Sequence, residues 1–389
     1  MEIAIQKGIQ DQGRKTMANK KLLIPVLLML VTTAQVFPEV VNKDKPQRGE
    51  WDLKLEKVWE VGRAGDAVLG RPQGMLVTDD GTLYLNDEAN RIDHIFGPDG
   101  AFVGSFAKRG EGPGEVQRHG RFFFSGDKVI IPDVGRIHYF SREGKYLTTV
   151  HRDCVPHAFV DENRLIDAPL SAVFLPEGKG KIALCDLRSG KDTVISEFSA
   201  FEGGVARSGG DVVADVIVPV FSPLMTIGYS GSRLYWGMND RYRIHVTGLD
   251  GRDIGSFSVD RKKTKVSPKD KREYFKTDRM PADMLKQIVD SLPDEVTCFH
   301  RIEVHNGLIF VFVTDIDLDN KMLRTRQIDI FSPEGQYLYR ARLDFGKDRV
   351  HLFSPLQNMV IQNGCLYAVL QDEKDDVLVA KYRISLPTL

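Results

Sequence analysis

The chain has 389 residues and a formal net charge of −1, from 53 basic and 54 acidic side chains. This balance gives no basic surface of the kind that nucleic-acid binding needs, so no nucleic-acid partner is expected. Hydrophobic residues make up 42% of the chain, which is enough for a packed core and excludes wholesale disorder.

The first 49 residues are predicted to be an extension that carries an export signal. From Met17 the chain has two lysines, then an apolar run over residues 22–31, then small residues that end at Ala34. This order is typical of a secretory signal, and the apolar run is shorter than the roughly 20 residues of a membrane-spanning helix. We therefore expect a signal peptide from Met17 to about Ala34, a periplasmic or extracellular protein, and no membrane span in the mature chain.

Short polar turns closed by glycine recur along the rest of the chain. They end at Gly100, Gly144, Gly190, Gly251 and Gly335, and glycine adopts the positive φ of such turns without steric cost. Most of them join two strand-like runs, as in RIDHIF-GPDG-AFVGSF over residues 91–106. Two such runs around a tight turn predict a β-hairpin.

A second hairpin lies upstream of the first in several units. Its signature is a Leu-Tyr pair after a turn glycine, with a proline 12 residues before the tyrosine. The tyrosines are Tyr84, Tyr235 and Tyr367, and the prolines are Pro72, Pro223 and Pro355. Two hairpins make a unit of four strands, and units repeated at about 40–50 residues are typical of propeller blades.

Six such units can be counted, with first strands predicted to begin near Gly74, His119, Phe159, Met225, His300 and Asn358. The sixth unit has only three strands, up to about Ile384. Its fourth strand is available near the other end of the chain, over Asp52–Val61. Closing a ring with this strand removes free sheet edges that would otherwise promote aggregation.

The stretch RPQGMLVTDDGTLYLNDEANRIDHIFGPDGAFVGSF, residues 71–106, resembles an NHL repeat. Over residues 50–386 the chain is similar to the six-bladed, TolB-like propellers of secreted bacterial proteins. The similarity is closest in the first two units and weakest in the third. It implies an all-β fold at residues 50–389, a six-bladed β-propeller of four-stranded antiparallel blades with the ring closed by the N-terminal strand.

The segment RGEGPGEV, Arg109–Val116, has the glycine content of a phosphate-binding loop. Such a loop must lead into a helix N-terminus, whose amide groups face the anion. Here a strand-like run, FFFSGDKVI, follows, Pro113 removes one amide, and no Lys-Ser or Lys-Thr pair closes the motif. The segment is therefore predicted to be a connector between blades.

Residues 261–297 interrupt the strand pattern between the fourth and fifth units. They are rich in charge, with apolar residues at helical spacing between Met284 and Leu292. Ser267 before Pro268 is typical of a helix start. A short helical insertion is predicted there, with its basic run at residues 261–265 in a solvated loop.

Candidate ligand-binding residues follow from the position next to the first-strand proline. This position is Gln73 in the first unit, and the same register gives His119 in the second. His157 follows Pro156, and His300 lies two residues beyond the registered Cys298. In the propellers that the chain resembles, this position approaches one end of the central channel. Gln73, His119, His157 and His300 are therefore predicted to lie at the channel mouth.

Three of these residues invite a metal hypothesis, because some six-bladed lyases and hydrolases hold a metal in the channel with histidines or carboxylates. No accompanying carboxylates are evident, and His157 and His300 do not keep the register of His119. We therefore expect that at least one of the three histidines fails to converge with the others, and we predict neither a metal nor another cofactor.

Other residues that suggest chemistry are interpreted as structural. His94, His138 and His245 fall in third strands, away from the axis. Asp87 and Asp133 recur after second strands, which favours a role in turns. The four cysteines have no C-x-x-C spacing and are interpreted as small buried side chains, although export would permit disulfides whose pairing the sequence leaves open.

No catalytic motif stands out, so no catalytic residue is assigned and the enzyme question stays open. The leading hypothesis is an exported, monomeric binding module that holds a protein, peptide or glycan on one face or at the channel mouth. The alternatives are a channel-centred, metal-dependent lyase or hydrolase and a scaffold in a surface assembly. Because fold does not dictate function, the ligand itself is not specified.

Overall fold

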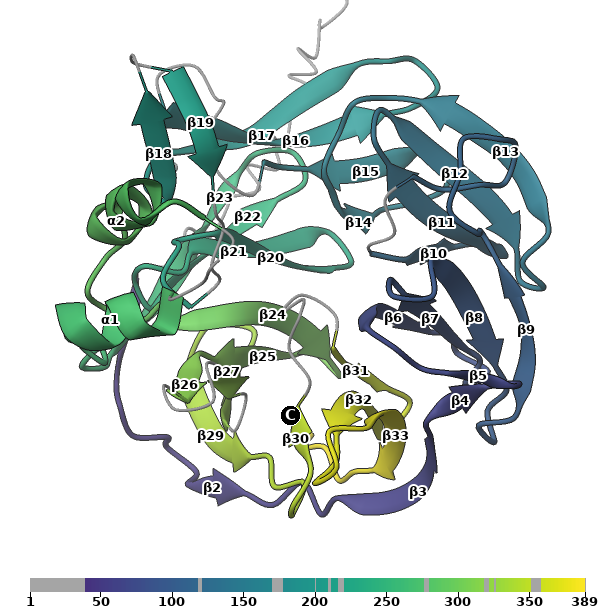
Figure 1. Ribbon diagram of the computed structural model, residues 1–389. Coiled ribbons are helices and arrows are strands. Elements are labelled where there is room, and N and C mark those ends of the chain that lie inside the picture. Colours follow the sequence, from purple (N-terminus) through teal and green to yellow (C-terminus); the bar gives the residue numbers. More distant parts are fainter. Residues whose placement is uncertain are drawn as a thin grey trace, which may run out of the picture. The chain divides into compact units, whose positions relative to one another are not determined.

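Strands follow one another as antiparallel hairpins in six groups around a common axis (Figure 1). The computed structural model describes residues 39–117, 121–169, 178–199, 201–208, 211–215, 220–275, 280–317, 322–324, 327–350 and 358–388. In five of the groups the four strands pair in chain order, and the sixth takes its outer strand from the N-terminal side of the chain. The strand that opens each group, or β31 in the sixth, lies innermost (Figure 1). Inner strands of neighbouring groups lie side by side around the axis.

The six groups are the blades of a propeller. Blade 1 consists of β6 (Pro72–Val77), β7 (Leu83–Asp87), β8 (Ile92–Phe96) and β9 (Phe102–Phe106). Blade 2 consists of β10 (Phe123–Ser125), β11 (Lys128–Asp133), β12 (Arg136–Ser141) and β13 (Tyr146–His151). Blade 3 consists of β14 (Pro156–Phe159), β15 (Arg164–Asp167), β16 (Lys179–Asp186) and β17 (Asp192–Ser199). Blade 4 consists of β20 (Met225–Ser230), β21 (Arg233–Met238), β22 (Arg243–Gly248) and β23 (Asp253–Asp260). Blade 5 consists of β24 (Phe299–His305), β25 (Leu308–Val313), β28 (Gln327–Phe331) and β29 (Tyr337–Arg342). Blade 6 consists of β31 (Met359–Gln362), β32 (Cys365–Gln371), β33 (Val377–Arg383) and β3 (Glu56–Val61). The predicted six-bladed propeller is confirmed, and the third unit, the weakest in sequence, forms a complete blade.

Ring closure follows the predicted route. Strand β3 pairs antiparallel with β33, from Glu56 opposite Arg383 to Val61 opposite Val379. Trp59 on β3 also reaches blade 1, where its indole nitrogen donates to the carbonyl oxygen of Pro98 at 3.0 Å. The closing strand therefore joins the last blade to the first.

A second use of the N-terminal segment was not predicted. Strand β1 (Val40–Lys43) pairs in parallel with β23, and β2 (Glu50–Trp51) pairs in parallel with β29. Residues 39–55, which we call the N-terminal belt, thus pass around the outside of blades 4 and 5 before β3 closes blade 6 (Figure 1). Two outer edges that the sequence pattern leaves open are covered in this way.

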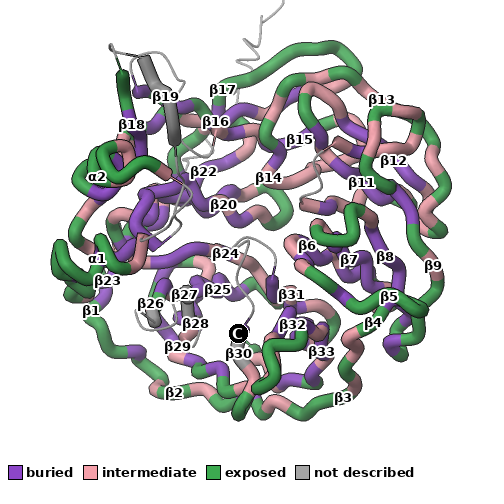
Figure 2. The backbone as a smooth tube through the Cα atoms, viewed as in Figure 1, coloured by how far each residue is buried: buried purple, intermediate pink, exposed green. Residues whose placement is uncertain are grey.

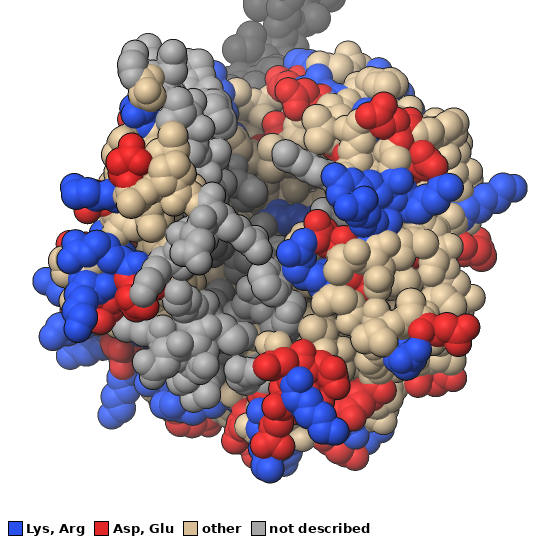
Figure 3. All heavy atoms as spheres, viewed as in Figure 1, with Lys and Arg blue, Asp and Glu red and all other residues tan. Residues whose placement is uncertain are grey.

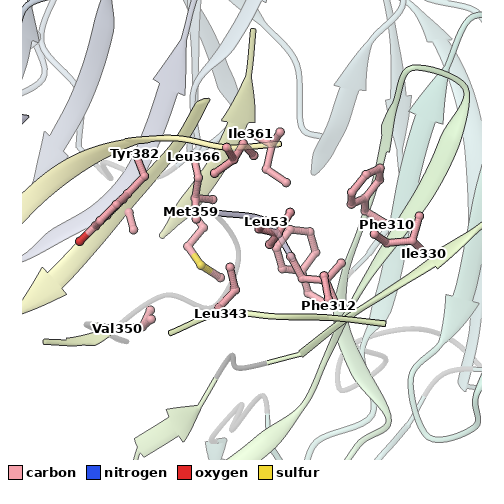
Figure 4. Close-up of a cluster of buried hydrophobic side chains, with 14 of the residues drawn as sticks. Leu53, Phe310, Phe312, Ile330, Leu343, Val350, Met359, Ile361, Leu366 and Tyr382 are labelled. Carbon is pink, nitrogen blue, oxygen red and sulfur yellow. The ribbon is translucent and has the colours of Figure 1, made fainter. Parts of the chain in front are cut away.

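Most of the hydrophobic core lies within and between the blades (Figure 2). The cluster shown in Figure 4 joins blades 5 and 6, with Phe310 and Ile330 on one side of Leu53 and Met359 and Leu366 on the other. Leu53 of the N-terminal belt is 1% exposed and belongs to the same cluster. The alternation of apolar residues in the strands places these side chains on the blade faces.

The turn glycines are required by geometry. Gly335, in the turn between β28 and β29, has a φ of +86°, and a Cβ there would lie 2.5 Å from the Cβ of Phe257. Only glycine accepts both that conformation and that close approach of blade 5 to blade 4.

The segment Arg109–Val116 connects blade 1 to blade 2, as predicted. Its loop is closed by a short parallel bridge between Arg109 and Val116, and Gly112 donates its amide proton to the Glu115 carboxylate at 3.0 Å. The next described element is strand β10. The geometry of a phosphate-binding loop is therefore not present.

The predicted helical insertion comprises α1 (Pro268–Phe275) and α2 (Ala282–Ser291). Ser267 accepts the amide proton of Asp270 at 3.1 Å and so caps α1. Ile288 of α2 is fully buried in a small separate core with Phe221 and Val266. No helix in the described part of the chain has the length and apolar character needed to cross a membrane.

Further short strands lie outside the blades or at their margins. They are β4 (Arg63–Ala64) with β5 (Ala67–Val68), β18 (Val205–Ser208) with β19 (Asp211–Asp215), β26 (Asp315–Asp317) with β27 (Met322–Arg324), and β30 (Arg349–Val350), which pairs with β32. Strand β18 packs against α2. The sequence analysis predicted none of these additions.

Side-chain carboxylates anchor the connectors that lead into the inner strands. Asp87, at the end of β7, accepts the amide protons of Gly70 and Arg71 at 2.9 and 3.0 Å. The aspartate at the same position in blades 2 and 3 binds the connector that leads into its own blade. Asp133 accepts the amide proton of Gln117, and Asp167 accepts that of Val155. The predicted turn role of Asp87 and Asp133 is thus extended, because these carboxylates fix where each inner strand begins.

Candidate functional site

A cavity of about 340 Å³ lies among the inner strands of the ring. Its lining comes from all six blades, through β6, β14, β20, β24 and β31 and through Arg121, which precedes β10. In the view of Figure 3, Lys and Arg atoms are visible in the hollow near the middle of the face. The cavity therefore lies on the ring axis, near which the sequence analysis predicted the candidate residues.

Three of the four predicted site residues occupy one structural position. Each inner strand β6, β14 and β24 has a bulge near its start, and the extra residue is Gln73, His157 and His300 respectively. The sequence register had placed His300 two residues away from this position, and that register was wrong. A bulge adds one residue without a partner and re-aims its side chain, so counting from the proline fails there.

The structure brings two of the predicted residues into the cavity. His157 and His300 belong to its lining, whereas in blade 1 the lining residues are Leu76 and Val77. A ligand role for Gln73 stays a prediction. His119 lies outside the described residues, so its place in the site and the non-convergence of the three histidines stay predictions as well.

His157 and His300 are neutral at physiological pH. Burial, reinforced by the charge of Arg121, lowers the pKa of His157 to about 3. Burial together with the charge of Arg301 lowers the pKa of His300 to about 3. His157 donates from Nε2 to the carbonyl oxygen of Ala168 at 3.1 Å, which leaves Nδ1 as the acceptor.

Arg121 is the functional residue that sequence reasoning missed. One of its terminal nitrogens lies 3.5 Å from Nδ1 of His157, and no carboxylate pairs with it in the part of the chain that the structure describes. Burial and the nearby charge of Arg301 lower the pKa of Arg121 to about 10, so it remains charged at neutral pH. It lies two residues after the predicted His119 in the chain, and no motif in the sequence marks it as a site residue.

A second polar row runs along β24. Arg301, Glu303 and His305 alternate along the strand and all line the cavity. The guanidinium of Arg301 bonds to Glu303, and His305 bonds to the same carboxylate at 2.7 Å. Burial opposes ionisation of Glu303, but these two partners lower its pKa overall. Arg301 is thereby neutralised inside the protein, whereas Arg121 is not.

No group of three or more His, Cys, Asp or Glu side chains within the described ranges has the arrangement of a metal site. All four cysteines are unpaired. The guanidinium of Arg121 beside His157 also opposes a bound cation, because like charges in a poorly solvated channel repel strongly.

Two blades contain an Asp, His and hydroxyl combination that suggests a catalytic triad. In blade 1, Nδ1 of His94 lies 2.9 Å from Oγ of Ser105, while Nε2 lies 4.0 Å from Asp87. Blade 2 repeats the arrangement with His138 and Thr149 at 2.9 Å. Neither set lines the channel cavity, and burial lowers the pKa of both histidines. The repetition indicates that these groups hold the second, third and outer strands together.

Replacing His300 is expected to reduce the sensitivity of the fold to acid. Its pKa is about 3 in the folded protein against 6.5 ordinarily, so the unfolded chain takes up a proton first as the pH falls. This difference in pKa leaves the free energy of unfolding at its full value above about pH 6.5 and lowers it progressively as the pH falls toward about 3. When the pH is lowered from about 7 to about 5, the free energy of unfolding of His300→Gln should therefore fall by about 2 kcal/mol less than that of the wild type.

Denaturant unfolding at a series of pH values measures this effect. His151→Gln, at an exposed position, provides the matched control substitution. Parallel pH profiles for the wild type and His300→Gln would contradict the prediction.

Comparison with known proteins gives neighbours of fold only. No protein-family model matches the chain, and no curated protein matches it. Among solved structures it is similar to a member of the DUF4221 family from Bacteroides vulgatus, with 10% identity, 86% of this chain and 99% of that chain covered, and a TM-score of 0.49. It is also similar to virginiamycin B lyase from Staphylococcus aureus, with 11% identity, 86% and 100% covered, and a TM-score of 0.42.

A third similar structure is BamB from Moraxella catarrhalis, with 13% identity, 89% of this chain and 85% of that chain covered, and a TM-score of 0.34. At identities and TM-scores this low, none of these proteins transfers an activity or a ligand to this chain. The assignment as a six-bladed β-propeller therefore depends on its own strand pairing.

Proposed function

We propose that this protein is an exported binding propeller that holds a protein, peptide or glycan ligand at the channel mouth. The observation that supports this best is the cavity on the ring axis, to which all six blades contribute. A concave site with apolar walls and a few converging polar groups is typical of ligand binding. Export is proposed from the signal-like segment between Met17 and Ala34, which lies outside the described residues.

The metal-dependent lyase or hydrolase has less support. It would need several neutral or anionic ligands around one point, whereas the described lining offers three histidines, His157, His300 and His305, near two guanidinium groups. Its single carboxylate, Glu303, is already bound to Arg301 and His305. A binding role uses the same groups without requiring a cation among them.

Narrowing the channel should abolish binding. Val360 lines the cavity from β31, and Val360→Trp places a bulky ring there. In calorimetric screens with defined soluble peptides and oligosaccharides, we expect a ligand that binds the wild type and is lost in Val360→Trp, because the ring occupies the volume that the ligand needs.

Val103→Trp is the matched control. Val103 is 65% exposed and lies on β9, the outermost strand of blade 1. Because this strand is the one farthest from the ring axis, the variant should bind as the wild type does. A ligand that binds Val360→Trp unchanged would place the site elsewhere on the propeller. If no peptide or oligosaccharide binds the wild type, the proposed function fails for these ligand classes.

A further inference from the structure

Arg121 carries a positive charge into the channel that the described protein groups do not balance. The Lys, Arg, Asp and Glu residues among the described residues of the lining are Arg121, Arg301 and Glu303, and Arg301 is paired with Glu303. One guanidinium charge therefore remains, beside two histidines that are neutral at physiological pH. Arg121 is half-buried, and a half-buried cation without a counter-ion loses part of its hydration. A ligand that supplies one negative charge would offset this loss.

The guanidinium has one long contact in the cavity and is not saturated. Its contact with Nδ1 of His157 uses one terminal nitrogen, and the Nε2 bond of His157 to Ala168 fixes the imidazole in the tautomer that accepts at Nδ1. Arginine has five N–H donors in a planar fork that matches a carboxylate in two places at once. The remaining donors can take up such a carboxylate without displacing another acidic side chain.

The rest of the lining indicates what is attached to the carboxylate. Apolar side chains from several strands surround the charged groups, among them Leu76, Met225, Ile227 and Val360. Tyr229 is the single Phe, Tyr or Trp residue among the lining residues that the structure describes, so flat aromatic platforms on which sugar rings stack are scarce there. The walls suit aliphatic side chains better than a glycan.

The shape of the site favours a chain end. A cavity of about 340 Å³ enclosed by inner strands of the ring is at the lower end of ligand-site volumes. A peptide can enter such a space along the axis with its terminus first, whereas an internal side chain must bring two flanking segments with it. Capture of a terminal carboxylate is an established mode of peptide recognition.

We propose that the channel cavity binds the C-terminal carboxylate of a peptide with aliphatic last residues, with Arg121 as the carboxylate-binding group and His157 as its positioning residue. This inference rests on the proposed function, since it specifies the ligand of the same site. It adds a chemical class, a direction of entry and a residue that the sequence analysis did not include.

Isothermal titration with synthetic hexapeptides ending in Leu-Val tests the proposal. The free acid should bind the wild type, and the same peptide with an amidated C-terminus should bind roughly 10- to 100-fold more weakly, because a charge-assisted hydrogen-bond pair is lost. Arg121→Gln should weaken the free acid by a similar factor and leave the amide nearly unchanged. Arg121→Lys should restore part of the preference for the acid.

Controls separate this proposal from the function on which it rests. Arg142, bound to Asp80 on the surface, provides the matched variant Arg142→Gln, which should bind as the wild type does. Equal affinity for acid and amide in the wild type would overturn the proposal without any variant. Tighter binding of a hexapeptide with an internal Glu and an amidated end, or of digalacturonate, than of the free-acid hexapeptide would likewise overturn it. The proposed function of the channel as a ligand-binding site would then still hold. The proposed function would instead fail if Val360→Trp bound every tested ligand as the wild type does.

Discussion

Replacing Glu56–Val61 with six alternating Gly and Ser residues is expected to abolish cooperative folding of the ring. Strand β3 supplies the outer strand of blade 6 and ties it to blade 1 through the bond from Trp59 to Pro98. Trp59 also contacts Tyr367 of β32, with ring centroids 5.9 Å apart. Without β3 the edge of β33 is open, and an open strand edge pairs readily with other chains. The loss should exceed about 4 kcal/mol in free energy of unfolding.

Light scattering and differential scanning calorimetry measure this outcome as aggregation and as loss of a single sharp transition. A graded control is removal of the chain up to Gly49, which eliminates β1 but keeps β3. That variant should melt at a lower temperature than the wild type but still as one cooperative unit. A soluble Gly-Ser variant with a single cooperative transition would show that the ring does not need this strand.

Asp329→Ala is expected to lower the free energy of unfolding by about 3–5 kcal/mol, since it leaves buried polar groups without their charged partner. Asp329 is fully buried on β28. Its carboxylate accepts the hydroxyl protons of Tyr242 and Tyr337, both at 2.6 Å, and lies 2.8 Å from Arg261. Burial and this carboxylate raise the pKa of both tyrosines, which therefore stay protonated and donate to it.

Denaturant unfolding with Asp44→Ala as the control isolates the contribution of burial. Asp44, in the N-terminal belt, binds Arg261 and Arg340 at 2.6 and 2.7 Å, but its side chain is 37% exposed. Its loss should cost only about 0–1 kcal/mol, as is usual for exposed ion pairs. Equal destabilisation by the two variants would mean that the belt, rather than the buried carboxylate, holds blades 4 and 5 together.

The sequence determined the architecture because that information is local and repeated. Glycine turns at fixed intervals and strand-like runs on both sides of them predicted six blades, and the missing strand of the last blade identified residues near Glu56–Val61 as the closing strand. The helical insertion and the connector over Arg109–Val116 were predicted for the same reason, because helical spacing and turn chemistry are read within a few residues.

The tertiary structure decided the N-terminal belt and the anchoring of the connectors. Strand β1 consists of VVNK, which is too short to carry a periodic pattern. Its partner β23 lies more than two hundred residues later in the chain, so only the folded ring brings them together. Likewise, Asp87 and Asp133 were recognised as turn residues, but the amides that they bind belong to connectors that precede their own inner strands.

The site was divided between the two levels. His157 and His300 were predicted at the channel because the proline and turn register places inner strands near the axis, but counting along the chain could not see the bulges that align His300 with His157. The unbalanced charge of Arg121 was decided by tertiary structure alone. A guanidinium is balanced or not according to which carboxylates fold next to it, and Glu303, on a different blade, is already bound to Arg301.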